Sequence, residues 1–112
     1  MSAYQVVFQV AREGAEFHEA VVRNVRNVTA ELDDVAIRII AHGDGIEFAT
    51  GRTAANAGVR AALEVGEVLA CQNTLRRKEI PESEVLPGVR LVRAGLAELV
   101  RLQHGGWAYI HP

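Results

Sequence analysis

Apolar residues in this chain occur in two patterns, short continuous runs and stripes at helical spacing. Five runs rich in β-branched or aromatic residues predict strands. They are Tyr4–Val10, Val35–His42, Val68–Cys71, Val89–Val92 and Trp107–Ile110. Apolar residues fall on both faces of the first run, which is typical of a central strand that is covered on both sides.

The longer segments between these runs have helical spacing. The clearest stripe predicts a helix over residues 15–32, which Asp33 and Asp34 close. Its members are Phe17, Val21, Val25, Val28 and Leu32. The small-residue segment Ala54–Gly66 predicts a second helix, with Thr53 as its N-cap.

Weaker patterns predict the remaining helices. A short helix is expected from Asn73 or Thr74 through Glu79, followed by one helical turn at Pro81. A last helix is expected from about Gly95 to His104. Residues 42–45 are expected to form a loop, and residues 46–49 either make a short turn or pack under the sheet.

The alternation of strands and helices predicts an α/β fold. Such alternation is typical of a parallel sheet with helices on both faces, joined by right-handed crossovers. We therefore expect a three-layer α/β/α sandwich with a five-stranded, mainly parallel sheet. A length of 112 residues fits a single domain over residues 1–112.

Composition narrows the classes of function. The formal net charge of −2 and the absence of a basic stripe with aromatic residues argue against a nucleic-acid partner. No run approaches the roughly 20 apolar residues that span a bilayer, so we expect no membrane insertion. With one cysteine and no export signal, we expect a cytoplasmic protein without an internal disulfide.

The strongest candidate for chemistry is Cys71, the only cysteine of the chain. It ends a predicted strand, and the carboxyl ends of strands border the ligand crevice in open α/β sheets. A following helix dipole and the cations of residues 76–78 favour the thiolate, which is the reactive form. The alternative is an inert thiol buried at the end of a strand.

The neighbours of Cys71 have two interpretations each. Asn73 and Thr74 either donate hydrogen bonds to a sulfur anion or a bound substrate, or only cap the helix. Arg76 either screens an anion or is a solvated surface residue. His42, at the same sheet edge, is either a proton shuttle or a loop histidine bonded to backbone. Asp44 either orients His42 or forms a turn with its own backbone.

Motifs for metals and cofactors are missing from the sequence. With no His-x-x-x-His or Cys-x-x-Cys spacing, we expect no metal site. Gly43-Asp44-Gly45 does not extend to Gly-x-Gly-x-x-Gly because residue 48 is Phe, and no Gly-x-x-x-x-Gly-Lys loop occurs. We therefore expect no cofactor.

Four segments of the chain carry a more specific pattern. They are Cys71-Gln72-Asn73-Thr74-Leu75, Leu86-Pro87-Gly88-Val89, Gly95-Leu96-Ala97-Glu98-Leu99 and Gln103-His104-Gly105-Gly106-Trp107-Ala108-Tyr109. Together they resemble the DsrE/DsrF-like family of small proteins of sulfur relay and intracellular sulfur oxidation, which includes YchN-like members. The resemblance covers nearly the whole chain and is strongest from Val65 onward.

The resemblance implies a three-layer domain with a five-stranded parallel sheet, assembled as homo-trimers or hexamers. For some members it implies a cysteine that carries a persulfide and hands the sulfur to another protein, and only Cys71 is available for that role. Trp107 and Tyr109 either form subunit contacts or pack over the edge of the core. The small-residue helix Ala54–Gly66 is a second candidate interface.

Two hypotheses of function follow. In the first, a small soluble sulfur-handling protein holds sulfane sulfur on Cys71 as a persulfide and passes it to a thiol, with a sulfur donor or acceptor protein as partner. In the second, a non-catalytic oligomeric module binds a small ligand or a protein in the crevice near His42 and Cys71. The supporting residues would be Asn73, Thr74, His42, Asp44 and Arg76.

Overall fold

The computed structural model describes residues 2–112, and within that range five strands form one sheet. The strands are β1 Tyr4–Val10, β2 Val35–Ala41, β3 Glu67–Cys71, β4 Arg90–Val92 and β5 Ala108–Ile110. They lie in the order β4-β3-β2-β1-β5, and every neighbouring pair is parallel. The predicted class is therefore confirmed, and each strand lies within one residue of its predicted bounds at either end.

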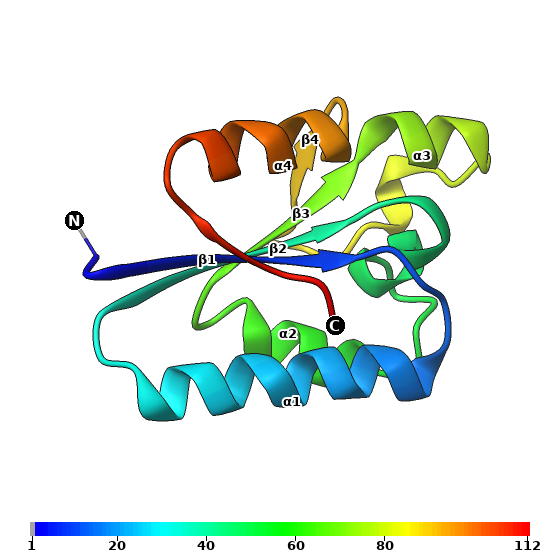
Figure 1. The fold of residues 1–112 in the computed structure, drawn as a ribbon. Coiled ribbons are helices and arrows are strands. Elements are labelled where there is room, and N and C mark those ends of the chain that lie inside the picture. Colours follow the sequence, from blue (N-terminus) through cyan, green and yellow to red (C-terminus); the bar gives the residue numbers. More distant parts are fainter. Residues whose placement is uncertain (1) are drawn as a thin grey trace.

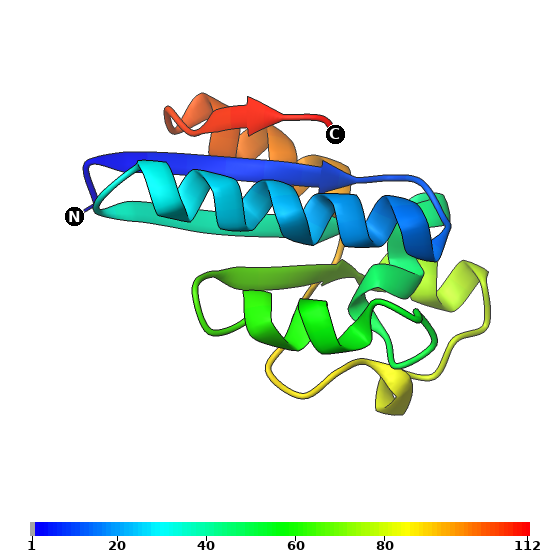
Figure 2. The same ribbon diagram turned by 90° about the horizontal axis from the view of Figure 1, so that it is seen from below.

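Helices cover both faces of this sheet. They are α1 Ala15–Glu31, α2 Asn56–Ala62, α3 Gln72–Arg77 and α4 Gly95–His104, with the 3₁₀ helices η1 Gly43–Ala49 and η2 Glu82–Glu84. The helices α1 and α2 lie side by side on one face (Figure 2). The helices α3 and α4 lie on the other face (Figure 1), which gives the three layers that the alternation predicts.

Each face of the sheet has its own apolar core. The core under α1, α2 and η1 includes the buried residues Phe8, Val21, Val25, Ile39 and Phe48. The core under α4 consists of Val7, Ile40, Leu69, Leu99 and Leu102. Burial of one such large side chain contributes roughly 1.5–3 kcal/mol, so the two cores hold the sheet between the helices.

The helix α1 follows its predicted stripe and ends one residue earlier than expected. It begins after Gly14, whose φ of 108° lies where residues with a side chain are strained. The chain then turns into β2 through Asp34, at a φ of 55°. The carboxylate of Asp34 accepts a hydrogen bond from the Ala3 N–H at 2.9 Å, which ties the start of β1 to this turn.

The second helix is shorter than predicted, and Thr53 is not its N-cap. Helix α2 covers only Asn56–Ala62, and its N-cap is Ala55. The Thr53 hydroxyl instead bonds to Nδ1 of His18 at 2.9 Å and accepts from the Ala55 N–H. Past Ala62 the chain turns early, because Gly66 lies so close to β2 that a Cβ there would come within 2.7 Å of the Ile37 carbonyl oxygen.

The third helix also begins earlier than predicted. Cys71 is the N-cap of α3, so Asn73 and Thr74 lie inside the helix, and the interpretation of these residues as caps is wrong. The backbone N–H of Asn73 donates to the Arg93 carbonyl oxygen at 3.1 Å. The carbonyl of Arg93, between β4 and α4, therefore accepts from an N–H at the start of α3 that a capping side chain would otherwise bond.

The predicted loop after β2 folds largely as the 3₁₀ helix η1. Its residues Ile46 and Phe48 are fully buried, so the segment 46–49 packs against the sheet. Gly45 makes this possible, because a Cβ at that position would lie 2.2 Å from the Val10 carbonyl oxygen. The close packing of η1 fixes the position of the chain directly after His42.

Candidate functional site

The candidate site lies where β2, β3 and β4 end. Cys71 is the last residue of β3 and pairs with Val92, the last residue of β4, while His42 directly follows β2. After β2 the chain leads to η1 and then to α2, on one face of the sheet, whereas after β3 and β4 it leads to the face of α4 (Figure 1). Strand ends whose connections diverge in this way leave a crevice in open α/β folds.

A hollow of about 210 Å³ occupies this crevice. Its lining residues are His42, Gly43, Cys71, Asn73, Thr74, Arg77, Ala94, Gly95 and Leu96. Cys71 is only 6% exposed, but it forms part of the wall of the hollow. The thiol is therefore buried beside an opening that polar and charged groups also line.

Gly95 creates much of the space beside the thiol. A Cβ at position 95 would lie 3.3 Å from Cβ of Cys71 and 3.1 Å from Cβ of His42. Both distances are tighter than ordinary van der Waals contact. Gly95, the first residue of α4, thus lies between the side chains of Cys71 and His42 and in close contact with both.

Opposing influences act on the thiol of Cys71. Burial raises its pKa, but hydrogen bonding from the Thr74 hydroxyl and from the backbone N–H groups of Gly95, Thr74 and Asn73 lowers it by more. The pKa of Cys71 consequently lies below the usual 9.0. In its neutral form the thiol donates to the Arg93 carbonyl oxygen at 3.9 Å. Because the Asn73 N–H also donates to the Arg93 carbonyl, Thr74 and Gly95 supply the more dedicated donors.

The hydroxyl of Thr74 is held in place from the other side. It accepts a hydrogen bond from the Gly43 N–H at 3.0 Å. Since a hydroxyl has a single hydrogen and that N–H occupies one of its lone pairs, its hydrogen is free for the sulfur. Thr74 therefore couples the thiol to the start of η1.

Among the cations that follow Cys71, only Arg77 lines the hollow. Arg76, which the sequence predicts as a supporting residue, precedes Arg77 directly; its side chain is exposed and does not line the hollow. Lys78 instead pairs with the carboxylate of Asp44 at 3.1 Å. The lowered pKa of Cys71 has hydrogen bonding as its cause. The N–H groups of Asn73 and Thr74 at the start of α3 contribute, in line with the predicted influence of a following helix, whereas the predicted cations are not among the causes.

The imidazole of His42 bonds to a side chain. Its Nε2 lies 2.8 Å from Nε2 of Gln9 on β1, so the predicted bond from the ring to the backbone is not formed. Asp44 pairs with Lys78 and does not orient the ring. Burial, and then the nearby His111, lower the pKa of His42 from the ordinary 6.5. The ring therefore lines the hollow mainly in its neutral form at pH 7.

Comparison with known proteins adds the context of a family. The sequence profile of the DsrE/DsrF-like family matches residues 5–112. The chain belongs to the DsrE/DsrF-like family. The resemblance inferred from the segments around Cys71 and Trp107 is thereby confirmed.

A solved structure supports the same assignment. This DsrE/DsrF-like chain is similar to MTH1491 from Methanobacterium thermoautotrophicum, a protein of unknown function, with a TM-score of 0.92 and 32% sequence identity. The similarity covers 97% of this chain and 99% of that one. No match was found among proteins with curated descriptions.

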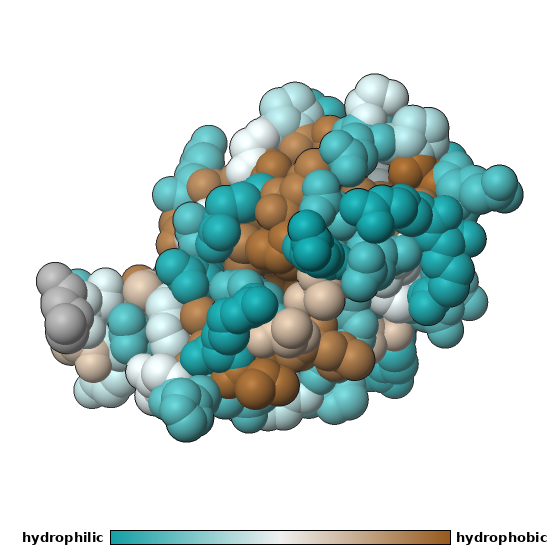
Figure 3. Space-filling view, turned by 90° about the horizontal axis from the view of Figure 1, so that it is seen from above, coloured by the Kyte–Doolittle hydropathy of each residue, from teal (hydrophilic) through white to brown (hydrophobic). Residues whose placement is uncertain are grey.

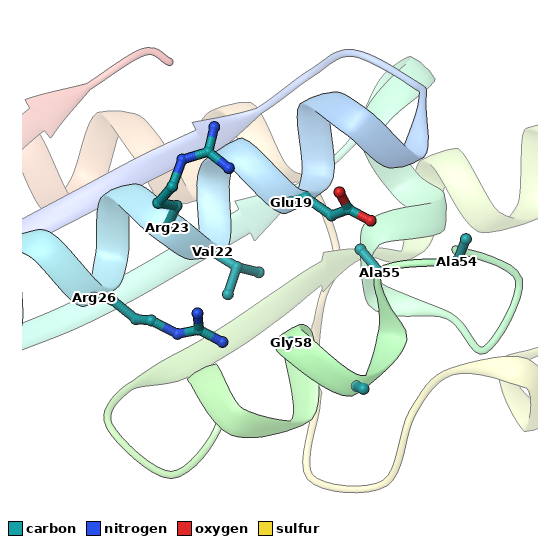
Figure 4. Close-up of a pocket in the computed structure, with 8 residues that line it drawn as sticks. Glu19, Val22, Arg23, Arg26, Ala54, Ala55 and Gly58 are labelled. Atoms are coloured by element: carbon teal, nitrogen blue, oxygen red, sulfur yellow. The ribbon is translucent and has the colours of Figure 1, made fainter.

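A larger hollow of this DsrE/DsrF-like protein lies on the opposite face of the sheet. It measures about 350 Å³ and lies between α1 and α2 (Figure 4). Its lining residues are Glu19, Val22, Arg23, Arg26, Ala54, Ala55, Ala57 and Gly58. It contains neither a thiol nor an imidazole, so we place the candidate chemistry in the smaller hollow at Cys71.

The described residues offer neither a metal cluster nor a membrane-spanning helix. Within residues 2–112, no three His, Cys, Asp or Glu side chains are grouped so that they could hold a metal ion. In the same range, no helix has the length and apolar character required to cross a membrane.

Three residues at or beside the site were not assigned to it from the sequence, although Tyr109 was considered as a subunit contact or as packing over the core edge. They are Gln9, Gly95 and Tyr109, the last of which donates a hydrogen bond to Gln9. Gln9 is one of two glutamines in the largely apolar strand β1 and lies next to its carboxyl end, and this signal was available in the sequence. For Gly95 no local signal exists, because its closeness to Cys71 depends on how α4 returns over the sheet.

Proposed function

We propose that this DsrE/DsrF-like protein is a sulfur carrier that holds sulfane sulfur on Cys71 as a persulfide. The observation that carries the proposal is the thiol at the wall of a hollow, with hydrogen bonds that favour its thiolate. A thiolate is the nucleophile in sulfur exchange, whereas a neutral thiol is not. Membership of the family adds independent support, since it implies a function of the sulfur-relay type.

The loading step is an exchange between sulfur atoms. The Cys71 thiolate attacks the outer sulfur of a donor persulfide R–S–SH, a new S–S bond forms, and the donor S–S bond breaks. The donor leaves as the thiolate R–S⁻, and Cys71 becomes Cys–S–SH, so that no external oxidant is needed. In the unloading step, the thiolate of an acceptor attacks the outer sulfur, and Cys71 leaves as the thiolate.

The site suits both steps. The hollow of about 210 Å³ exceeds the roughly 30 Å³ that one water occupies, so it leaves room for the outer sulfur and part of a donor. Donors from Thr74 and Gly95 stabilise the Cys71 thiolate before loading and again when it leaves. A leaving thiol with a lower pKa departs faster, so the same hydrogen bonds assist transfer in either direction.

Unloading requires an acceptor thiol from another molecule, because the protein has a single cysteine. The face of α4 carries an apolar area bordered by polar residues (Figure 3). Leu96, which also lines the hollow, is 60% exposed, and Val100 is 66% exposed one turn later. This apolar area beside the thiol supports a protein contact, and our proposal includes assembly into homo-trimers or hexamers together with a sulfur donor or acceptor protein.

Intact-mass measurement tests the carrier proposal. The purified protein is incubated with polysulfide, desalted and weighed, beside the variant Cys71→Ser. We expect wild type to gain one sulfur atom that a small thiol removes, and the variant to gain none. If wild type gains no sulfur from polysulfide or from a protein persulfide donor, the carrier proposal fails and a binding module at the same hollow becomes the better explanation.

A further inference from the structure

A chain of hydrogen bonds crosses the sheet beside Cys71. The hydroxyl of Tyr109 donates to Oε1 of Gln9, and Nε2 of Gln9 donates to Nε2 of His42. The strand order β3-β2-β1-β5 places Cys71, His42, Gln9 and Tyr109 on or just past four successive strands. The chain of bonds therefore runs across the strands, from Tyr109 on the edge strand β5 to His42, which lies beside Cys71.

The register puts these side chains on one face. Gln9 pairs with Ile40, two residues before His42, and Tyr109 pairs with Val7, two residues before Gln9. Because side chains alternate along a strand, residues two apart share a face. Val7 and Ile40 belong to the core under α4, so the chain of bonds lies on the face of α4, where Gly95 separates His42 from Cys71.

This arrangement assigns the proton of the imidazole. The amide nitrogen of Gln9 can only donate, so Nε2 of His42 accepts. A neutral imidazole whose Nε2 accepts carries its hydrogen on Nδ1. Protonation of Nε2 would place two N–H groups against each other, and rotation of the amide would relieve this only by reversing the direction of the bond that Tyr109 donates.

The Nδ1 atom is open to the outside. It has no hydrogen-bond partner among residues 2–112, and in that range no fully buried side-chain nitrogen lacks a partner. Nδ1 therefore reaches the surface, and His42 lines the hollow that Cys71 shares. A hydrogen on Nδ1 is thus available to an anion bound there.

We propose that Tyr109 and Gln9 are positioning residues that hold His42 as a neutral imidazole, so that its Nδ1–H donates a hydrogen bond to the sulfur anion carried at Cys71. The role at sulfur rests on the proposed carrier function, whereas the tautomer of His42 does not depend on it. A neutral donor stabilises the anion without adding a charge that would have to be desolvated in the half-buried hollow.

Other groups that face His42 act in different directions. His111, which follows β5, and Arg77 of α3 disfavour a positive charge on the ring, whereas a thiolate at Cys71 favours one. Asp44, which is close in sequence, pairs with Lys78. The lowered pKa of His42 agrees in direction with a ring that is held neutral.

Nitrogen-detected NMR of protein with ¹⁵N-labelled histidine tests the tautomer. His42 is assigned by the signal that disappears in His42→Asn, and its titration is followed in wild type, Tyr109→Phe and Gln9→Glu. We expect the Nδ1–H tautomer in wild type and a larger share of the Nε2–H tautomer in Tyr109→Phe. In Gln9→Glu the carboxylate accepts from Nε2–H, which raises the pKa of His42 by about one unit or more.

The matched control is Tyr4→Phe, which removes an exposed tyrosine hydroxyl from β1 without touching the chain of bonds. It should leave the His42 signals unchanged. An Nε2–H tautomer in wild type, or equal effects of Tyr4→Phe and Tyr109→Phe, would overturn the proposal.

The role at sulfur has its own measurement. We expect the rate at which polysulfide loads Cys71 to follow one ionisation in wild type and to acquire a second inflection, at the raised pKa of His42, in Gln9→Glu. Identical pH profiles would overturn the role at sulfur. If the NMR results are as expected but wild type takes up no sulfur, the carrier proposal fails while the assignment of the tautomer stands.

Discussion

Gly95 packs directly against Cys71, and a side chain at position 95 would fill the space beside the thiol. A Cβ on residue 95 would lie 3.3 Å from Cβ of Cys71 and 3.2 Å from Cγ2 of Ile40. The backbone of α4 therefore approaches the end of β3 closely, and its first N–H reaches the sulfur. The size of the hollow and the ionisation of the thiol depend on the same residue.

The variant Gly95→Ala tests this dependence. We expect alkylation of Cys71 by iodoacetamide to slow by about tenfold or more, because the methyl group crowds the path of attack and shifts the N–H donor. Gly51→Ala is the control, since a Cβ there meets nothing within 4 Å. Equal alkylation rates in the two variants would show that Gly95 does not shape the site.

Thr74 is expected to set the ionisation of the thiol. In Thr74→Val the sulfur loses its side-chain donor while burial persists, so the pKa of Cys71 should rise towards or above its usual 9.0. The pH dependence of the iodoacetamide rate measures this shift. Thr74→Ser keeps the hydroxyl and should behave as wild type, and a shift of the same size in both variants would contradict the role of the hydrogen bond.

The architecture was predictable because its signals are local. Runs such as Val35–His42 are short, largely apolar and rich in β-branched residues, which favours a covered parallel strand, and the stripe on α1 has the period of a helix. The position of Cys71 at the end of a strand followed from the same pattern. Parallel pairing then brings the end of β2, and with it His42, close to the thiol.

The details of the site depend on tertiary contacts that no local pattern contains. Thr74 has the residue type of a helix cap, but its hydroxyl is used by Gly43, which is distant in sequence. The same holds for Thr53, whose hydroxyl bonds to His18. In both cases the polar side chain bonds to another part of the fold, so propensity gave the wrong partner.

Arg77 and Arg76 should differ in their effect on anions. Because Arg77 lines the hollow and Arg76 does not, Arg77→Gln should lower the ratio of the iodoacetate rate to the iodoacetamide rate by about threefold, as one nearby charge in a hydrated site would. The neutral reagent corrects for any change in the ionisation of Cys71. Arg76→Gln is the matched control, and a larger effect in that variant would reverse the assignment.

The bond between His18 and Thr53 should matter for stability. His18 is buried against Phe48, and its ring nitrogens bond to the Thr53 hydroxyl at 2.9 Å and to the Arg12 carbonyl at 3.0 Å. Thr53→Val leaves a buried nitrogen without a partner and should lower the free energy of unfolding by about 1–3 kcal/mol. Urea denaturation measures the change, and Thr29→Val, whose hydroxyl bonds at the surface of α1, should cost less.

The titration of His42 should make the fold less stable in mild acid. Its pKa is lowered in the folded protein, so between that value and the ordinary 6.5 the unfolded chain binds more protons than the folded one. The free energy of unfolding should therefore fall as the pH drops below about 6.5, and this contribution should level off once folded His42 is itself protonated. Urea denaturation across this range should show a shallower dependence in His42→Asn, because that variant has no proton to bind in either state. If the two proteins lost stability in parallel, burial of a neutral His42 beside Cys71 would not be the cause of the acid sensitivity.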